Sequence, residues 1–296
     1  MRIGEALGWL GQGERLAWRS LRAGTLGNAG LRPAASAVLR PLTAPSRYPE
    51  YDLFLDRLLD LDDRTNWVLD VGSPKLFSLL LASRIRATLV ATDIWQPAIT
   101  EAEALRGGLT PEASARLILA AADIREELPA ELLPPEGKFA AAFSMSVIEH
   151  IEPDPGGDRI ALERMADVVR PSGSVVVSVP TAPQARSEYV QSEVYGRTAD
   201  EDSRGAFFQR RYDRAALEAL CADVAPRLTL ESCTIVEWPD NHPFMRLLDR
   251  FPTATGFAGT GFSLLAGSFG IRPDSPSIPD IRTLGDAILK LRVVES

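Results

Sequence analysis

The sequence is poor in the residues that build metal centres and disulfide frameworks. It contains two cysteines, Cys221 and Cys233, and two histidines, His150 and His242, among 296 residues. The cysteines lack the spacing of metal ligands, and one pair makes no disulfide framework. We therefore predict no bound metal, and a reducing cytoplasm is the default location.

Long apolar runs and excess positive charge are also missing. No stretch reaches 18 uninterrupted apolar residues, which argues against a membrane span, and Gly8, Gly11 and Glu14 interrupt any signal-peptide core. The net charge of −8 argues against a general nucleic-acid binder. A hydrophobic content of 45% with 24% charged residues is ordinary for a globular protein, so we expect a buried core.

Positive charge is concentrated in residues 1–47. Seven arginines stand there against Glu5 and Glu14, a net of +5, which leaves −13 for the remainder. The spacing predicts a basic helical extension, followed by a linker over 24–45. One helical face would hold Ile3, Leu7, Leu10, Ala17 and Leu21, and another Arg15, Arg19 and Arg22. The extension either covers the core or dimerises, or it contacts a membrane surface, an acidic partner or a carrier protein.

The stretch 66–94 carries the strongest local pattern. An apolar run from Trp67 to Val71 has the length of a strand and ends in a turn that begins at Gly72. Helical spacing follows, and a second strand over 88–92 leads into Asp93, 21 residues after Gly72. Such a glycine lets the backbone approach a ligand, and an acid about 20 residues later can bind the two hydroxyls of a ribose. The pattern predicts a nucleotide-cofactor site without specifying the cofactor.

These residues resemble the first two motifs of class I S-adenosylmethionine-dependent methyltransferases. The similar segments are Val68-Leu69-Asp70-Val71-Gly72 and Leu89-Val90-Ala91-Thr92-Asp93. The family's first motif usually runs acid-x-Gly-x-Gly-x-Gly, whereas Pro74 and Leu76 stand at the later glycine positions here. The resemblance implies S-adenosylmethionine as the cofactor. It places the cofactor-binding residues of this region at Asp70, Gly72, Ser73, Asp93 and Ile94.

The order of the later segments resembles the same family. Strands are expected over 117–121, 139–146, 174–180 and 228–236, with a helix over 158–169. After the third strand the resemblance implies an adenine contact by Asp123 and Ile124, although Asp123 could instead cap the segment that follows. Over residues 48–236 the resemblance implies an α/β fold with a seven-stranded, mostly parallel, doubly wound Rossmann-like sheet. The seventh, antiparallel strand is expected at the sheet edge over 261–269, and a final helix over 284–291.

Polar residues follow the fourth strand. His150 lies at a strand's carboxyl-terminal tip, which suits a general base, and Tyr212 is a second candidate. The resemblance adds Ser146 as a cofactor contact and Glu149 as a substrate contact, but Glu149 and His150 could equally brace the loop. Some relatives hold a divalent cation with Glu-x-x-Glu-His; Ser146 replaces the first Glu here, so no metal is predicted.

Aromatic residues and arginines gather in an insertion over 183–212. We predict that this insertion is a lid, with Tyr189 and Phe208 as pocket walls. Arg210 or Arg211, the latter preferred, would bind a carboxylate or phosphate of the substrate. Alternatively, Tyr212 begins a helix and the two arginines form surface ion pairs.

The sequence thus divides into an extension over 1–47, a methyltransferase core over 48–272, and a connector with a helix over 273–296. We expect methyl transfer from S-adenosylmethionine to a small molecule, at oxygen. A non-catalytic relative stays open because of Pro74 and Leu76, and so does an NAD-dependent oxidoreductase or epimerase. A nucleic-acid methyltransferase is disfavoured by the acidic core. Peripheral membrane contact through 1–47 and a dimer both stay open.

Overall fold

The computed structural model describes residues 3–22, 47–61, 63–153, 155–191, 205–237 and 270–294. Side chains are described for all of these except 3–11, 13, 47–49, 270 and 273. The predicted linker over 24–45, the predicted edge strand over 261–269 and His242 lie outside the described residues.

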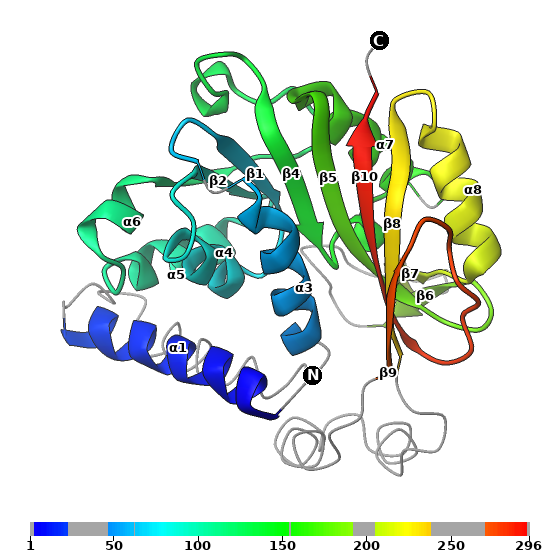
Figure 1. The fold of residues 1–296 in the computed structure, drawn as a ribbon, viewed down its shortest axis with the longest axis horizontal. Helices are drawn as coiled ribbons and strands as arrows, with labels where there is room; N and C mark the ends of the chain where they lie inside the picture. The colour runs from blue at the N-terminus through cyan, green and yellow to red at the C-terminus, as the bar shows by residue number, and fades with distance from the viewer. Residues whose placement is uncertain are drawn as a thin grey trace.

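One large mixed sheet forms the centre of the fold (Figure 1). Its parallel half consists of β1 (Trp67–Val71), β2 (Thr88–Asp93), β3 (Leu117–Ala121), β4 (Phe139–Met145) and β5 (Val169–Thr181). These strands lie in the order β3-β2-β1-β4-β5, so the direction of winding reverses between β1 and β4. All seven residues of β4 are buried, as expected of a strand covered on both faces. The predicted Rossmann-like architecture is confirmed.

The other half of the sheet contains the main correction. The stretch 284–291 is not a helix: β10 (Gly285–Val293) is a strand that runs antiparallel to both β5 and β8 (Leu228–Glu237). The antiparallel strand β10 therefore lies inside the sheet. Within the described residues the sheet has eight strands, and β9 (Gly270–Ser275), which is antiparallel to β8, forms its edge. The apolar residues of 284–291 also fit helical spacing, whereas the alternation of Leu289, Leu291 and Val293 with Lys290 and Arg292 is the pattern of a strand.

Helices cover both faces of this sheet. On one face lie α3 (Arg47–Leu59), α4 (Lys75–Ala82) and α5 (Gln96–Arg106), and on the other α7 (Gly157–Val168) and α8 (Arg214–Val224). Aromatic rings of Phe54, Phe77 and Phe143 meet edge to face at centroid distances of 5.8–6.1 Å on the first face. A short helix, α6 (Pro111–Ala115), precedes β3.

The N-terminal helix α1 (Ile3–Arg22) packs across α5, α3 and α4. Its buried face includes Leu16, Ala17 and Ser20, and the Ser20 hydroxyl donates a hydrogen bond to the Leu105 carbonyl at 2.8 Å. Of the predicted apolar face, Ala17 is buried, whereas Leu21, one turn later, is 41% exposed. The outer face carries Trp18 together with Arg15, Arg19 and Arg22. Among the described residues, no helix is long and apolar enough to cross a membrane.

Gly108 allows α1 to approach the core closely. A Cβ at this position would lie 2.4 Å from the Leu16 carbonyl oxygen. We expect Gly108→Ala to loosen α1 from the core, so that the amides of residues 14–22 exchange with solvent about tenfold faster. Hydrogen exchange read by mass spectrometry measures this effect. The neighbouring Gly107 has an α-helical backbone and is exposed, so Gly107→Ala serves as the control. Unchanged exchange in Gly108→Ala would contradict the packing.

A second, two-stranded sheet occupies the predicted lid insertion. Here β6 (Arg186–Val190) pairs antiparallel with β7 (Ala206–Arg211), and residues 192–204 between them lie outside the described residues. The helix after this hairpin begins at Arg214 rather than at Tyr212. Asp213 is its N-cap, and its carboxylate accepts a hydrogen bond from the Ala216 amide at 2.8 Å.

Candidate functional site

A solvent-open pocket lies where the carboxyl ends of β1 to β4 meet. It contains about 440 Å³ of empty space. Five of the predicted cofactor-binding residues come together in it. The lining residues are Val71, Gly72, Asp93, Ile94, Ala122, Asp123, Ile124, Arg125, Val147 and Ile151. This is the position at which open α/β sheets bind ligands, beside the reversal of strand order.

Gly72 is required at the pocket for two reasons. Its φ of +69° lies in the left-handed region, and a Cβ would come within 2.7 Å of the Val147 side chain. Its amide donates to the Thr92 carbonyl at 2.9 Å, which ties the turn after β1 to the end of β2. The first glycine of the motif therefore lets Val147 pack against the turn and form a wall of the pocket.

Asp93 is partly exposed in the pocket and partly engaged by the protein. One carboxylate oxygen accepts a hydrogen bond from the Trp95 amide at 2.9 Å, and the other lies 3.6 Å from the Lys75 ammonium. Burial raises the pKa of Asp93, and the Lys75 ammonium and the Trp95 amide oppose this rise. The side chain retains 15% exposure, so its carboxylate is accessible to a small ligand.

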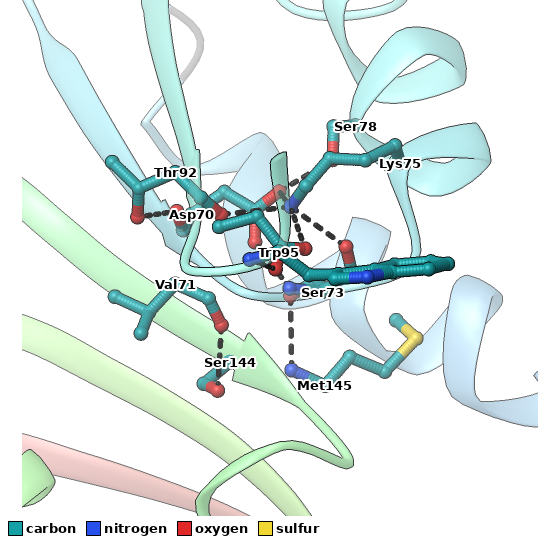
Figure 2. A network of polar contacts seen from close by, with 10 residues as sticks. Asp70, Val71, Ser73, Lys75, Ser78, Thr92, Trp95, Ser144 and Met145 are labelled. Carbon is teal, nitrogen blue, oxygen red and sulfur yellow. Dashed lines mark hydrogen bonds and ion pairs between the residues drawn. The ribbon is translucent and has the colours of Figure 1, made fainter. Parts of the chain in front are cut away.

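Asp70 and Ser73 lie below the pocket surface rather than on it. Asp70 is fully buried and accepts hydrogen bonds from the Ser73 amide, at 3.1 Å, and from the Ser78 hydroxyl. Ser73 is 1% exposed, and its hydroxyl accepts a hydrogen bond from the Met145 amide at 3.0 Å. Figure 2 shows this network beneath the turn. Both residues hold the turn in place, and neither lines the pocket.

Lys75 is a residue that the sequence reasoning missed. It is the first residue of α4, and its side chain is only 5% exposed. The ammonium donates to the carbonyls of Ser73, at 2.8 Å, and Thr92, at 2.9 Å (Figure 2). It also lies 3.6 Å from carboxylate oxygens of both Asp70 and Asp93. The only available signal was a lysine placed directly after Pro74 inside an incomplete glycine motif.

Asp123 is held by a neighbouring arginine. The Arg125 guanidinium donates to its carboxylate at 2.6 and 3.0 Å, and the Arg125 amide donates at 2.9 Å. Burial opposes ionisation of Asp123, but the Arg125 hydrogen bonds and charge outweigh it, and the net effect lowers its pKa. Asp123 lines the pocket as an ionised carboxylate beside Ile124, which is compatible with accepting a hydrogen bond from an amine.

The loop after β4 contains Ser146, Glu149 and His150, and none of the three lines the pocket, whereas Val147 and Ile151 do. Ser146 has a φ of +49°, and its hydroxyl donates to the buried Glu50 carboxylate at 3.1 Å. The Nδ1 atom of His150 lies 2.5 Å from the Phe208 carbonyl oxygen, and its Nε2 lies 3.6 Å from Glu149. Glu149 is 1% exposed. These contacts brace the loop against β7, as the alternative interpretation expected.

The hairpin side chains are also engaged within the protein. Arg210 is buried and donates to the carbonyls of Ile151, at 2.8 Å, and Pro153, at 2.5 Å. Arg211 forms an ion pair with Glu188 at 2.7 Å, in line with the ion-pair alternative.

The two aromatic residues proposed as pocket walls pack within the hairpin region. Tyr189 packs against Phe207 at a centroid distance of 5.9 Å, and Phe208 packs against His150 at 5.1 Å. The pocket lining includes neither Tyr189 nor Phe208.

Tyr212 is buried in the core on the face of the sheet that α7 and α8 cover. Its hydroxyl donates to Asp158 at 2.6 Å. Burial, together with the Asp158 carboxylate, raises the pKa of Tyr212. A phenol that holds its proton this firmly is a poor general base at neutral pH.

The described residues include both cysteines and other side chains of the types that can bind a metal. Burial raises the pKa of Cys221 to about 11 and that of Cys233 to about 12, so both stay protonated thiols at neutral pH. Within the described ranges, no group of three or more histidine, cysteine, aspartate or glutamate side chains is placed to hold a metal ion.

Comparisons with known proteins agree with the architecture. No family model matches the chain, and no curated protein matches it by sequence. Among solved structures, the MccD protein superposes with a TM-score of 0.50 at 15% identity, covering 83% of this chain and 98% of MccD. At this identity the likeness shows the fold alone. The chain has the Rossmann-like fold found in class I S-adenosylmethionine-dependent methyltransferases.

Two further structures are similar at lower TM-scores. The glycopeptide N-methyltransferase MtfA, solved with S-adenosylmethionine, has a TM-score of 0.47 at 12% identity, covering 83% of this chain and 93% of MtfA. The [4+2]-cyclase SpnF has a TM-score of 0.46 at 18% identity, covering 81% of this chain and 82% of SpnF.

Proposed function

We propose that this chain is a methyltransferase that uses S-adenosylmethionine and methylates a small molecule, at an oxygen atom. The observation that carries the proposal is the convergence of Gly72, Asp93, Ile94 and Asp123 on one pocket at the carboxyl edge of the sheet. These residues come from three separate strand ends, at the spacing of the motifs that the sequence resembles.

The residues of the pocket fit the adenosyl part of that cofactor. Asp93 offers carboxylate oxygens to the two ribose hydroxyls. Ile94 is 65% exposed and, with Ile124, offers apolar surface to a planar base, while Asp123 can accept a hydrogen bond from its amine. When bound, S-adenosylmethionine supplies a methyl group activated by its positively charged sulfur. The chain's own task is then to hold the acceptor in line with that methyl group, and such positioning contributes up to about 7–11 kcal/mol.

An oxygen acceptor calls for a proton-accepting group, and His150 is the best-placed candidate. The contact between Nδ1 and the Phe208 carbonyl favours the tautomer in which Nδ1 carries the proton, which leaves Nε2 to accept one. A hydroxyl loses its proton when it is methylated, so a base contributes to that reaction. For His150 to act as this base, the acceptor must reach Nε2 beside the β6–β7 hairpin, the segment that the sequence predicts to be a lid.

Isothermal titration calorimetry tests the proposal directly. We expect saturable binding of both S-adenosylmethionine and S-adenosylhomocysteine to the full chain, with one site per chain. NAD⁺ serves as the comparison ligand, and we expect no saturable heat from it. If neither adenosyl compound binds at millimolar concentration, the proposed function is wrong. Binding of NAD⁺ alone would point to oxidoreductase chemistry instead.

A further inference from the structure

Lys75 places a buried positive charge within the glycine motif. Its ammonium is buried beneath the turn that ends β1. The positions on either side of Lys75, which hold Pro74 and Leu76 here, are usually glycines in the resembled family. The ammonium has three protons, and two of them are donated to the carbonyls of Ser73 and Thr92. The carboxylates of Asp70 and Asp93 supply the remaining neutralisation, each at 3.6 Å. A buried ammonium needs such a complete set of partners.

The lysine changes the charge that faces the pocket. Without it, Asp70 and Asp93 would form a buried pair of like charges with a net charge of −2; with it, the cluster carries −1. Asp93 transmits this difference, because it touches the lysine and also lines the pocket. The side chains of Lys75 and Asp70 are 5% and 0% exposed, so salt screens their charges little and their effect reaches a bound ligand.

We propose that Lys75 is a built-in counter-ion that shifts the ligand preference of the pocket away from positively charged sulfur. The inference rests on the proposed function. S-adenosylmethionine carries a positive sulfonium, whereas the sulfur of S-adenosylhomocysteine is neutral; the two are otherwise alike in base, ribose and amino-acid end. Lys75 therefore weakens binding of the methyl donor relative to the demethylated product. At an effective dielectric of about 20, one unit charge across a pocket of this size changes the affinity for S-adenosylmethionine relative to S-adenosylhomocysteine by roughly tenfold.

The measured quantity is the ratio of the dissociation constant of S-adenosylmethionine to that of S-adenosylhomocysteine, from calorimetry on the full chain. In Lys75→Met we expect this ratio to fall about tenfold, in favour of the donor. In Lys75→Arg, which keeps the charge, we expect it to stay within about twofold of the wild-type value. Any contact with the base or ribose that the substitution disturbs affects both ligands alike and cancels in the ratio.

A second pair of variants separates charge from shape and from folding. Asp70 does not line the pocket, so Asp70→Asn changes the charge of the cluster to zero without removing a ligand contact. We expect its ratio to rise about tenfold. Combining it with Lys75→Met restores the charge to −1, and we expect the ratio to return to near the wild-type value. This comparison removes the lysine without leaving two buried carboxylates uncompensated, so it decides the question even where Lys75→Met alone does not fold.

The possible results are distinct. A ratio that is the same with and without the lysine, in folded variants that bind both ligands, overturns the role of Lys75 and leaves the proposed function intact. A shift in Lys75→Arg as large as that in Lys75→Met would show that shape, not charge, matters, and would also overturn it. Failure of wild type and variants alike to bind either ligand is a failure of the proposed function itself.

Discussion

Replacing Asp93 with alanine should weaken binding of S-adenosylmethionine by about a hundredfold while the fold persists. Asp93 is a carboxylate that lines the pocket together with Gly72, and its loss removes the charged acceptor for two ribose hydroxyls. Hydrogen bonds to charged groups are worth about 1.5–3 kcal/mol each, so losing one or two of them accounts for a change of this size. Calorimetry with the donor measures the affinity, and circular dichroism checks the fold.

Two comparisons make this result specific. Asp93→Asn keeps the size of the side chain and one acceptor oxygen, so its affinity should lie between those of wild type and the alanine variant. Glu136 is an exposed carboxylate away from the pocket, and Glu136→Ala should bind as wild type does. Retention of full affinity in Asp93→Ala would remove the central support for the proposed function.

The raised pKa of Asp93 adds a dependence on pH. Burial raises this pKa, and ribose hydroxyls bind best to the ionised carboxylate. Affinity for the cofactor should therefore fall as the pH drops through the raised pKa, at a higher pH than for an ordinary aspartate near 3.9. The same shift means that Asp93 favours the folded state below the pKa of the unfolded chain, and that this contribution is lost as the pH rises through the folded-state pKa. In Asp93→Asn the affinity should lose this part of its dependence on pH.

Replacing His150 with alanine should lower turnover by about 10²- to 10⁴-fold and leave the affinity for S-adenosylmethionine within about twofold of wild type. Turnover is measured as formation of S-adenosylhomocysteine with an acceptor found by screening hydroxyl-bearing small molecules. The reason is that His150 is not among the residues that line the pocket, while the contact of Nδ1 with Phe208 leaves Nε2, which lies 3.6 Å from Glu149, as the atom that accepts a proton. Equal losses of turnover and affinity would assign the residue to bracing the loop.

The contact with Phe208 offers a way to separate the two roles of His150. The side-chain amide of His150→Asn can still donate a hydrogen bond to the Phe208 carbonyl, as Nδ1 does, but it cannot act as a base. We expect this variant to keep the stability of wild type, to be as slow as the alanine variant, and to lose the acid limb of the pH–rate profile. Full activity in His150→Asn would exclude His150 as the general base.

Local patterns predicted much of the fold and less of the site. The strands at 67–71, 117–121 and 139–146 were predicted because each is a short apolar run, and β1, β3 and β4 match them, with β4 ending one residue earlier at Met145. The spacing of Gly72 and Asp93 correctly indicated two residues of one pocket, since both lie at carboxyl ends of neighbouring strands. In contrast, β10 was predicted as a helix, because its apolar residues up to Leu291 also fit helical spacing, although the alternation over 289–293 is typical of a strand.

By itself, the sequence determined the parallel half of the sheet, its ligand-binding edge and the identity of the acidic residues there, because all of these follow from short-range spacing. Only the tertiary structure decided which of those acids reaches the pocket. It buried Asp70 under the turn, brought Lys75 against two carboxylates from different strands, and inserted β10 between β5 and β8. The physical reason is that burial and charge pairing depend on contacts between segments far apart in the chain, and such contacts leave no local periodicity to read.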